Sequence, residues 1–520
     1  MKRFTAIFLA SLLLTGCANA SVAEVTTVPT VPSIETVPVP ALEPDEKDYV
    51  SRFNSVTEIL LSDSGITVNG GGETESVYTS RDIIYYEDKD TYESGNPYGE
   101  GTDADKHTPE EANAHTVVNI TAPGAYRISG KLSAGQIRID LGEDADEDET
   151  AVVELILSDA DITCTVAPAI LFLNTYECDS SWSEDDAKPD VDTSAAGANL
   201  ILEGENTVHG AYVAKIFKDK DEEKKLWKQD GAIYSYMSLN VFGPGSLNLT
   251  AENEGLDTEL HLTIEGGDIS IYSGNDGINT NEDGVSVTTI NGGNVKILAG
   301  LGAEGDGIDS NGYLVINGGM VCASAHPASD AGMDSDLGSY IHGGTVIALG
   351  SAMDWAESDS EQVTMNLQFA AQQSPGSTIR ITKEDGTEVF SVTPDTQNRS
   401  FSGLILSAPV LKQGQTYQIW LNDVQQQYTG TDVGMMGGPR PGGMAPPDGF
   451  GGQPPEDMEP GKRPEGMERP ELPEGEVPRM DKNGFGGRGP GNPDISGEAR
   501  TDFYMNDKVN AFSGVTGITK

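Results

Sequence analysis

The stretch "LTIEGGDISIYS" (residues 262–273) recurs in related form as "TTINGGNVKILA" (288–299), "LVINGGMVCASA" (314–325) and "SYIHGGTVIALG" (339–350). Each copy contains a strand-like run, a glycine pair and a second strand-like run. The glycine pairs follow one another at intervals of 26, 26 and 25 residues. A fixed period of this length, built from strands and tight turns without helix-forming segments, is typical of a β-solenoid. The repeat therefore predicts an all-β chain with a parallel β-helix over residues 116–350.

A second repeated phrase lies out of phase with the glycine pairs. It reads "GAIYS", "GLDTE", "GINTN", "GIDSN" and "GMDSD", starting at Gly231, Gly255, Gly277, Gly307 and Gly332. The residue after each glycine is apolar, and we expect these side chains to point inward and stack: Ala232, Leu256, Ile278, Ile308 and Met333. A sandwich of antiparallel hairpins is the alternative fold, but it does not require such regular repetition.

The same phrase repeats oxygen-bearing side chains. In a β-helix, equivalent residues of successive coils lie about 4.8 Å apart, so these side chains would form a row of carboxylates that repel one another. Calcium relieves this repulsion, because it takes six to eight oxygen ligands at about 2.3–2.6 Å. We predict calcium as the cofactor, with ligands drawn from Glu254, Asp257, Asp276, Asn279, Asn281, Asp283, Asp306, Asp309, Asn311, Asp334 and Asp336. The alternative is that Asn and Asp cap turns and form hydrogen-bonded ladders without a metal.

Charge and the first residues restrict the partners and the compartment. The 520-residue chain has a net charge of −51, which argues against nucleic acid as an electrostatic partner. Residues 1–17, "MKRFTAIFLASLLLTGC", have a basic start, an apolar run and a lipobox that ends at Cys17. This pattern predicts a lipoprotein signal peptide, lipidation of Cys17 and an anchored position on the extracellular face of a bacterial membrane. An ordinary signal peptide or an apolar anchor is the alternative.

Composition divides the rest of the chain. We expect a Pro/Thr-rich linker (18–50), a polar N-terminal segment (51–115), a small C-terminal β unit (351–433), a disordered Gly/Pro/Met-rich insertion (434–498) and a returning strand segment (499–520). The charged run 215–229 suits either a helix or a loop outside the fold. Cys164 and Cys178 could pair, or both could be small buried side chains; their spacing does not decide between these.

Several of these phrases carry a resemblance to a known family. "DGAIYSYMSLNVFGPGSLNL" (230–249), "GNDGIN" (274–279), "INGGNVKILA" (290–299), "GDGIDSNG" (305–312) and "INGGMV" (316–321) resemble the carbohydrate-binding β-helix family of bacterial surface proteins, whose clostridial representative binds plant cell-wall polysaccharide. The resemblance covers roughly 116–430 and the final segment. It implies a right-handed parallel β-helix, bound calcium, and a polysaccharide partner such as polygalacturonate or cellulose. It assigns no sugar-contacting residue.

The main rival is an enzyme, because parallel β-helices also host pectate lyases and polygalacturonases. A lyase needs a basic side chain to remove the C5 proton, and Lys296 is the only Lys or Arg between residues 231 and 350. The "GHG" and "RIK" phrases that accompany hydrolysis on this fold are also missing. We therefore predict non-catalytic, calcium-dependent binding of polysaccharide, with no catalytic residues. A purely structural surface or adhesion protein is the second alternative.

Overall fold

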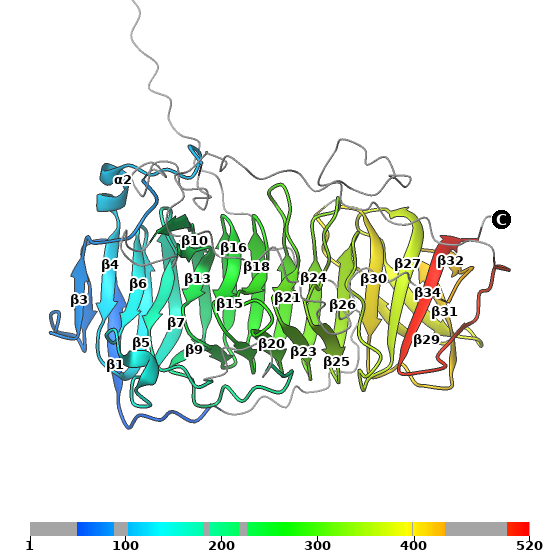
Figure 1. The fold of residues 1–520 in the computed structure, drawn as a ribbon, viewed down its shortest axis with the longest axis horizontal. Coiled ribbons are helices and arrows are strands. Elements are labelled where there is room, and N and C mark those ends of the chain that lie inside the picture. The colour runs from blue at the N-terminus through cyan, green and yellow to red at the C-terminus, as the bar shows by residue number, and fades with distance from the viewer. Residues whose placement is uncertain are drawn as a thin grey trace, which may run out of the picture. The chain divides into compact units, whose positions relative to one another are not determined.

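The computed structural model describes residues 49–87, 102–179, 187–217, 226–397, 399–431 and 497–518, all of which belong to one compact unit. The predicted signal peptide with Cys17, nearly all of the 18–50 linker and nearly all of the 434–498 insertion lie outside these residues. The described chain is almost entirely β, as the sequence predicts (Figure 1). Its helical elements are one short α-helix, α2 (Pro109–Ala114), and one 3-10 turn, η1 (Ala145–Glu147).

Most strands belong to three parallel ladders, in which each strand pairs with a strand from the next passage of the chain. The first ladder contains β4 (Thr116–Ile120), β6 (Gly135–Asp140), β8 (Ile170–Asn174), β13 (Gly231–Ser235), β16 (Glu254–Thr258), β19 (Ile278–Thr280) and β22 (Ile308–Ser310). The second contains β1 (Val56–Leu61), β5 (Gly124–Leu132), β7 (Val153–Cys164), β9 (Ala198–Glu203), β14 (Leu239–Phe242), β17 (Leu262–Ile264), β20 (Val287–Ile290), β23 (Tyr313–Ile316) and β25 (Gly338–Ile341). The third, which also starts at β7, contains β10 (Glu205–Gly210), β15 (Ser246–Ala251), β18 (Asp268–Ser273), β21 (Asn294–Leu298), β24 (Met320–Ser324) and β26 (Thr345–Gly350).

The chain visits the ladders in a fixed order, so β13, β14 and β15 are followed by β16, β17 and β18, and so on through β24. Every strand pairing between residues 256 and 344 is parallel, which rules out antiparallel hairpins over that range. Pairing also extends upstream of residue 116. There β1 joins β5 in parallel, β2 (Thr67–Val68) pairs with β1, and β3 (Val77–Ser80) pairs antiparallel with β4.

The apolar residues of the repeated phrase form part of the core. Each of the five has a fully buried side chain, as predicted: Ala232, Leu256, Ile278, Ile308 and Met333. Their stacking differs from the prediction at one end, because Ile233 and not Ala232 is the register partner of Leu256. The strand register between β13 and β16 is therefore shifted by one residue from the alignment of Gly231 with Gly255. The prediction that treated these two glycines as equivalent positions misplaces Ala232.

Each glycine pair forms the turn between a strand of the second ladder and the next strand of the third. Its second member has a positive φ of 103° at Gly267, 80° at Gly293, 74° at Gly319 and 77° at Gly344. Side chains of L-residues rarely adopt this conformation, so the pair must end in glycine for the turn to form. This requirement explains why the pairs are the clearest period in the sequence.

The structure describes only the two ends of the charged run 215–229, because residues 218–225 lie outside the described residues. Its two ends belong to β11 (Val213–Phe217) and β12 (Leu226–Gln229), which pair antiparallel as a separate two-stranded sheet. At these two ends the expectation of a helix or loop was wrong, because a charged sequence can still pair as strands. This hairpin places Lys228 against the first ladder.

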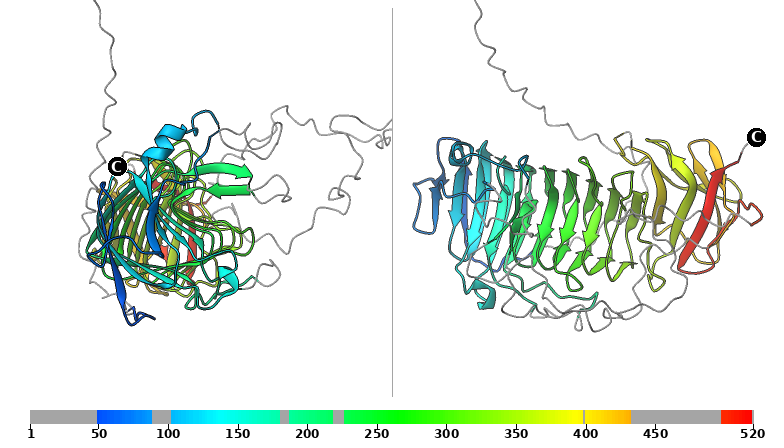
Figure 2. Two further views of the ribbon diagram at one scale, coloured as in Figure 1. Left: turned by 90° about the vertical axis from the view of Figure 1, so that its left-hand side faces the viewer. Right: turned by 45° about the horizontal axis from the view of Figure 1, so that its top comes forward.

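The predicted C-terminal β unit continues the large sheet beyond β26, at the yellow-to-red end of the ribbon (Figure 2). It comprises β27 (Thr364–Gln373), β28 (Ile379–Lys383), β29 (Glu388–Val392), β30 (Phe401–Ser407), β31 (Thr416–Leu421), β32 (Val424–Gln427), β33 (Phe503–Tyr504) and β34 (Val509–Gly517). Most of its pairings are antiparallel, and β30 also joins β26. The final segment returns to this unit, since β34 pairs with β27.

The cysteines of the described chain do not form disulfides. Cys164 and Cys322 are buried, Cys178 is partly buried, and all three are free thiols. Of the two alternatives left open by the sequence, the unpaired one holds for Cys164 and Cys178.

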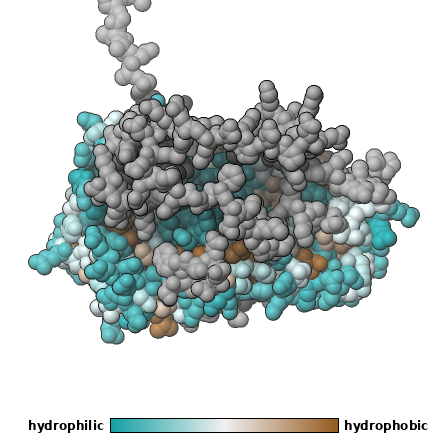
Figure 3. Space-filling model, viewed as in Figure 1, coloured by the Kyte–Doolittle hydropathy of each residue, from teal (hydrophilic) through white to brown (hydrophobic). Residues whose placement is uncertain are grey.

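Among the described residues, no helix is long and apolar enough to cross a bilayer. The face in Figure 3 is mostly hydrophilic where it is coloured.

Candidate functional site

The predicted row of oxygen ligands follows the first ladder. Asp257, Asn279 and Asp309 are register partners on β16, β19 and β22, as the repeated phrase predicts. Each of them lies next to a core residue in sequence, so its side chain points to the opposite face of the strand. The hairpin β11–β12 supplies Lys228 on that face.

Part of this row forms a compact, buried group that we name the acid cluster: Asp230, Glu254, Asp257 and Asn279. One oxygen from each of its three carboxylates lies within 4.8 Å of the others. Asp257 is fully buried; its Oδ1 accepts from Asn281 Nδ2, and its Oδ2 has no hydrogen-bond partner. Asn279 donates to Glu254 Oε2 at 3.1 Å, and its buried Oδ1 is also without a partner. The unpartnered Oδ2 of Asp257 therefore lies in a group of three carboxylates that could hold a cation.

Lys228 provides the one positive charge at the cluster among the described residues. Its Nζ donates to Asn281 Oδ1 and lies 3.4 Å from Asp230 Oδ2. Burial alone would lower the pKa of Lys228, but the carboxylates of Asp230 and Asp257 raise it well above its usual value. The side chain therefore remains an ammonium that partly neutralises the cluster. Sequence reasoning missed Lys228 and Asp230, because both precede the range searched for basic residues and ligands.

The carboxyl groups of the row hold protons more tightly than exposed ones. Burial is the main cause, and neighbouring carboxylates add to it. Together they raise the pKa of Asp230 and of Asp309 to about 7, and those of Asp257 and Asp276 well above the usual range. Ionising all of these groups without a cation would place several like charges in a poorly solvated region.

A second group of acids lines a cavity of about 290 Å³ near the end of the ladder, formed by Asp306, Asp330, Asp334 and Asp354. Asp330 Oδ2 accepts from the Gly305 N–H at 2.9 Å. Asp354 is buried; its Oδ2 accepts from Ser335 Oγ at 2.9 Å, while its Oδ1 has no partner. Burial raises the pKa of Asp306 and of Asp354 to about 8, with Asp334 the next cause for both. Asp354 was not predicted, because it follows the last glycine pair and belongs to no copy of the repeat.

The remaining predicted ligands lie away from these buried groups. Asn311 Nδ2 donates to Asp283 Oδ1 at 2.8 Å, and both Asp283 and Asp336 are exposed. Asn281 lies at the edge of the acid cluster, where it forms hydrogen bonds with both Asp257 and Lys228. The structure thus gathers most of the predicted set but leaves Asp283, Asn311 and Asp336 at the periphery.

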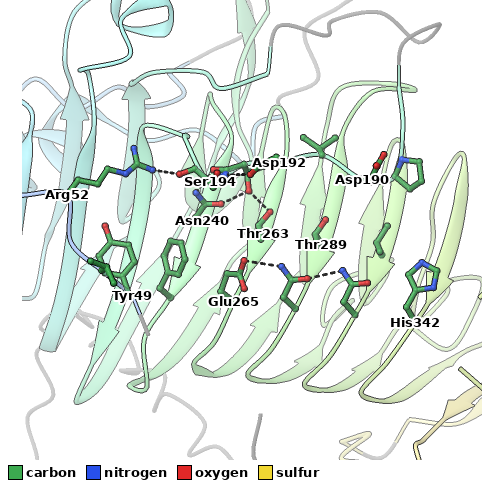
Figure 4. Close-up of a pocket in the computed structure, with 18 residues that line it drawn as sticks. Tyr49, Arg52, Asp190, Asp192, Ser194, Asn240, Thr263, Glu265, Thr289 and His342 are labelled. Atoms are coloured by element: carbon green, nitrogen blue, oxygen red, sulfur yellow. Dashed lines mark hydrogen bonds between the residues drawn. The ribbon is translucent and has the colours of Figure 1, made fainter. Parts of the chain in front are cut away.

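A second feature is a groove of about 620 Å³ along the outward face of the second ladder, over β14, β17, β20 and β23. In Figure 4, Ser194, Asp192 and Asp190 lie along one side of it, Glu265 and His342 along the other, and Thr263 and Thr289 between them. The first side is the strap, residues 189–194. Thr193 attaches the strap to the ladder, since its Oγ1 donates to Asn240 Oδ1 at 2.7 Å.

The opposite side of the groove is the row of residues that precede the glycine pairs: Glu265, Asn291, Asn317 and His342. Asn291 Nδ2 donates to Glu265 Oε1 at 3.0 Å, and Asn317 Nδ2 donates to Asn291 Oδ1 at 2.8 Å. The same repeat that stacks acids on the first ladder therefore stacks amides on the second. These residues recur with the period of the glycine pairs, so the sequence contains this signal.

Comparison with known proteins finds similarity to carbohydrate-binding domain-containing proteins. A family model described as "Carbohydrate-binding domain-containing protein" matches residues 114–379, just over half of the chain. A carbohydrate-binding domain-containing protein of Acetivibrio thermocellus is 27% identical over 155 residues, which are 30% of this chain and 44% of that relative. The matched part thus spans less than half of the relative's length.

One solved structure is also similar. It is titled as the polysaccharide lyase-like protein from C. thermocellum, in a gadolinium derivative. The match has 20% sequence identity and a TM-score of 0.32, and it covers 56% of this chain and 94% of that one.

Proposed function

The chain belongs to the family of carbohydrate-binding domain-containing proteins, and from this premise we propose that it binds polysaccharide through calcium and does not cleave it. The observation that carries the proposal is the acid cluster, with two buried oxygens that have no hydrogen-bond partner. We interpret the three parallel ladders as the faces of a right-handed parallel β-helix. On this fold the cluster is a rigid, preformed set of oxygen ligands.

Calcium suits this donor set. The cluster offers carboxylate and amide oxygens, which are the hard ligands that calcium takes, and its unpartnered oxygens have lost water without gaining a bond. Asp230, Glu254, Asp257 and Asn279 would hold the ion. When bound, it would neutralise the row and attract the carboxylates of an acidic polymer such as polygalacturonate. Without it, a chain with a net charge of −51 would repel such a polymer.

The state of Lys228 supports binding without turnover. A lyase base must accept a proton from the sugar, and this requires a pKa near the working pH. The surrounding carboxylates instead raise the pKa of Lys228, which keeps it protonated. Lys228 therefore acts as a counterion of the acid cluster in the metal-free chain.

We also propose that lipid on Cys17 anchors the protein to the extracellular face of the membrane. The support is the lipobox sequence together with the Pro/Thr-rich spacer that follows it. A tethered binder raises the local concentration of polymer at the surface, which suits capture better than release of product.

The test measures binding and turnover in one preparation. Purified protein is mixed with polygalacturonate in calcium or in chelator, and bound polymer, unsaturated product and new reducing ends are followed. We expect binding in calcium, loss of binding in chelator, and no product in either. Sustained product formation would make the protein an enzyme, and equal binding in chelator would remove the role of calcium.

A further inference from the structure

We propose that the groove on the second ladder is a separate glycan-binding site, which takes a straight, uncharged polysaccharide chain without calcium. This goes beyond the calcium-linked binding above and shares with it only the class of ligand. The acid cluster lies on β16, β19 and Asp230, which joins β12 to β13, whereas the groove lies over β14, β17, β20 and β23. No residue of the acid cluster lines the groove.

The first argument is the regular geometry of the groove. Five residues at equivalent positions line it: Phe242, which ends β14, and Glu265, Asn291, Asn317 and His342, which follow β17, β20, β23 and β25. Neighbouring strands lie about 4.8 Å apart, so four intervals give a straight row of about 19 Å. A row of evenly spaced polar groups matches an extended polymer whose hydroxyls recur regularly. A compact ligand would use only part of it.

The second argument is the capacity for hydrogen bonds. An Asn amide has two N–H donors and an oxygen that accepts twice. Within the row, Asn291 and Asn317 each donate one N–H, and Asn291 accepts one bond. Asn291 is partly exposed and Asn317 is exposed, so both retain donors and acceptors that face solvent. Sugar hydroxyls both donate and accept, and they match this mixed pattern.

His342 extends the same pattern at the end of the row. Its Nδ1 accepts from the backbone N–H of Glu361 at 3.3 Å, so the neutral ring carries its proton on Nε2. Its ring stacks with that of Tyr340, with centroids 6.2 Å apart. At the other end, Tyr49 and Phe242 pack with ring centroids 4.7 Å apart. Both ends of the polar row thus carry ring faces, which suit the apolar faces of sugar rings.

The third argument is charge, and it selects an uncharged ligand. The groove is lined by the carboxylates of Glu265, Asp190 and Asp192. Among the described residues that line it, the one Arg or Lys is Arg52, whose guanidinium donates to the backbone carbonyls of Ser194 and Ala195. A polyanion would meet three like charges and one positive group already bonded to the protein. The groove is therefore poorly suited to polygalacturonate or nucleic acid and well suited to a neutral glycan.

The test uses the full chain with cellohexaose as the uncharged probe and a galacturonic acid oligomer as the acidic one. Binding is measured by calorimetry in chelator and in calcium. We expect cellohexaose to bind equally in both. The double variant Asn291→Ala/Asn317→Ala should bind it about tenfold more weakly, as expected when two hydrogen-bonding side chains are removed. Asn248→Ala, on β15 of the third ladder, is the matched control and should bind like the unmodified chain.

The outcomes separate this inference from the proposed function. Unchanged cellohexaose affinity in the double variant, or binding that requires calcium, would overturn the groove site alone. Binding of the acidic oligomer in calcium with no binding of cellohexaose would also overturn it and leave the calcium-linked function intact. Binding of neither probe would overturn both. A melting curve of each variant shows that it is folded, and Asn317→Ala alone, at an exposed position, serves if the double variant is not.

Discussion

Replacing Asp257 with Asn should separate a metal ligand from a structural hydrogen bond. The substitution keeps the size of the side chain and an oxygen that can accept from Asn281 Nδ2. It removes the negative charge and replaces the unpartnered, fully buried Oδ2. Asp257 is therefore a position where a ligand role and a folding role predict opposite results.

In chelator, we expect Asp257→Asn to leave stability unchanged or raise it. A buried charged group without a partner costs at least about 1–3 kcal/mol, and the substitution recovers up to that amount where Asp257 is ionised. Where Asp257 carries a proton, because burial and Glu254 raise its pKa, the change is close to neutral. Each kcal/mol shifts the melting temperature of a 150–250-residue domain by about 2–4 °C, so the shift here should be zero to a few degrees upward.

In calcium, the unmodified chain should gain more stability than the variant. Calcium at a hundred times its dissociation constant stabilises the folded chain by about 2.7 kcal/mol. If the lost charge weakens binding tenfold, the same formula gives about 1.4 kcal/mol at that concentration. The unmodified chain should then gain the larger shift on adding calcium.

The assay is thermal unfolding at pH 8 in chelator and across a calcium titration. Glu304→Gln, which removes an exposed acid beside the second acidic group, is the control and should behave like the unmodified chain. A variant that melts several degrees lower in chelator and keeps the whole calcium shift would refute the reasoning, since Asp257 would then be a structural group and no ligand.

Three further predictions concern Lys228, the buried acids Asp306 and Asp354, and Gly277. Lys228→Met should lower the melting temperature in chelator more than in calcium, because it removes the ammonium beside Asp230; Lys296→Met, at a surface ion pair, should show no such difference. The metal-free chain should lose stability as pH rises from about 4 through about 8: Asp306 and Asp354 hold protons when folded that they release when unfolded, so the unfolded state is favoured as those protons leave. The calcium shift should grow over the same pH range, and a pH-independent melting curve in chelator would contradict this. Gly277→Ala should destabilise the fold by about 1–3 kcal/mol in urea unfolding, because the new Cβ would lie 2.1 Å from Ile297 Cγ2, whereas Gly72→Ala meets nothing and should be neutral.

Much of the architecture could be predicted because the chain repeats its structural constraints in the sequence. The glycine pairs require a positive φ at the same turn in each passage, and this fixed the period and the parallel pairing. The register of Asp257, Asn279 and Asp309 followed from the same period. Ala232 was misplaced where the period slips, because a shared glycine marks a phrase and does not fix strand register.

The site was less accessible to sequence reasoning, because its completing groups lie outside the repeat. Lys228 and Asp230 reach the acid cluster from a hairpin and its adjoining turn, and Asp354 reaches the second acidic group from the segment after the last glycine pair. Periodicity carries no information about such residues. Only the fold brings them to the row.

The acidic side chains follow the first ladder and the amide side chains follow the second. This separation also explains how so acidic a chain could bind a glycan. Parallel pairing stacks equivalent residues of successive passages, so polar side chains recur along each of the two outward rows. On the first ladder the row contains carboxyl groups whose burial favours either the protonated form or a bound cation. On the second it contains amides such as Asn291 and Asn317, which bond to one another in a chain and repel nothing. Charge on the first ladder therefore need not weaken binding on the second, provided that the ligand in the groove is itself uncharged. If a polyanion were instead found in the groove, this separation would fail, and calcium would have to act on both ladders at once.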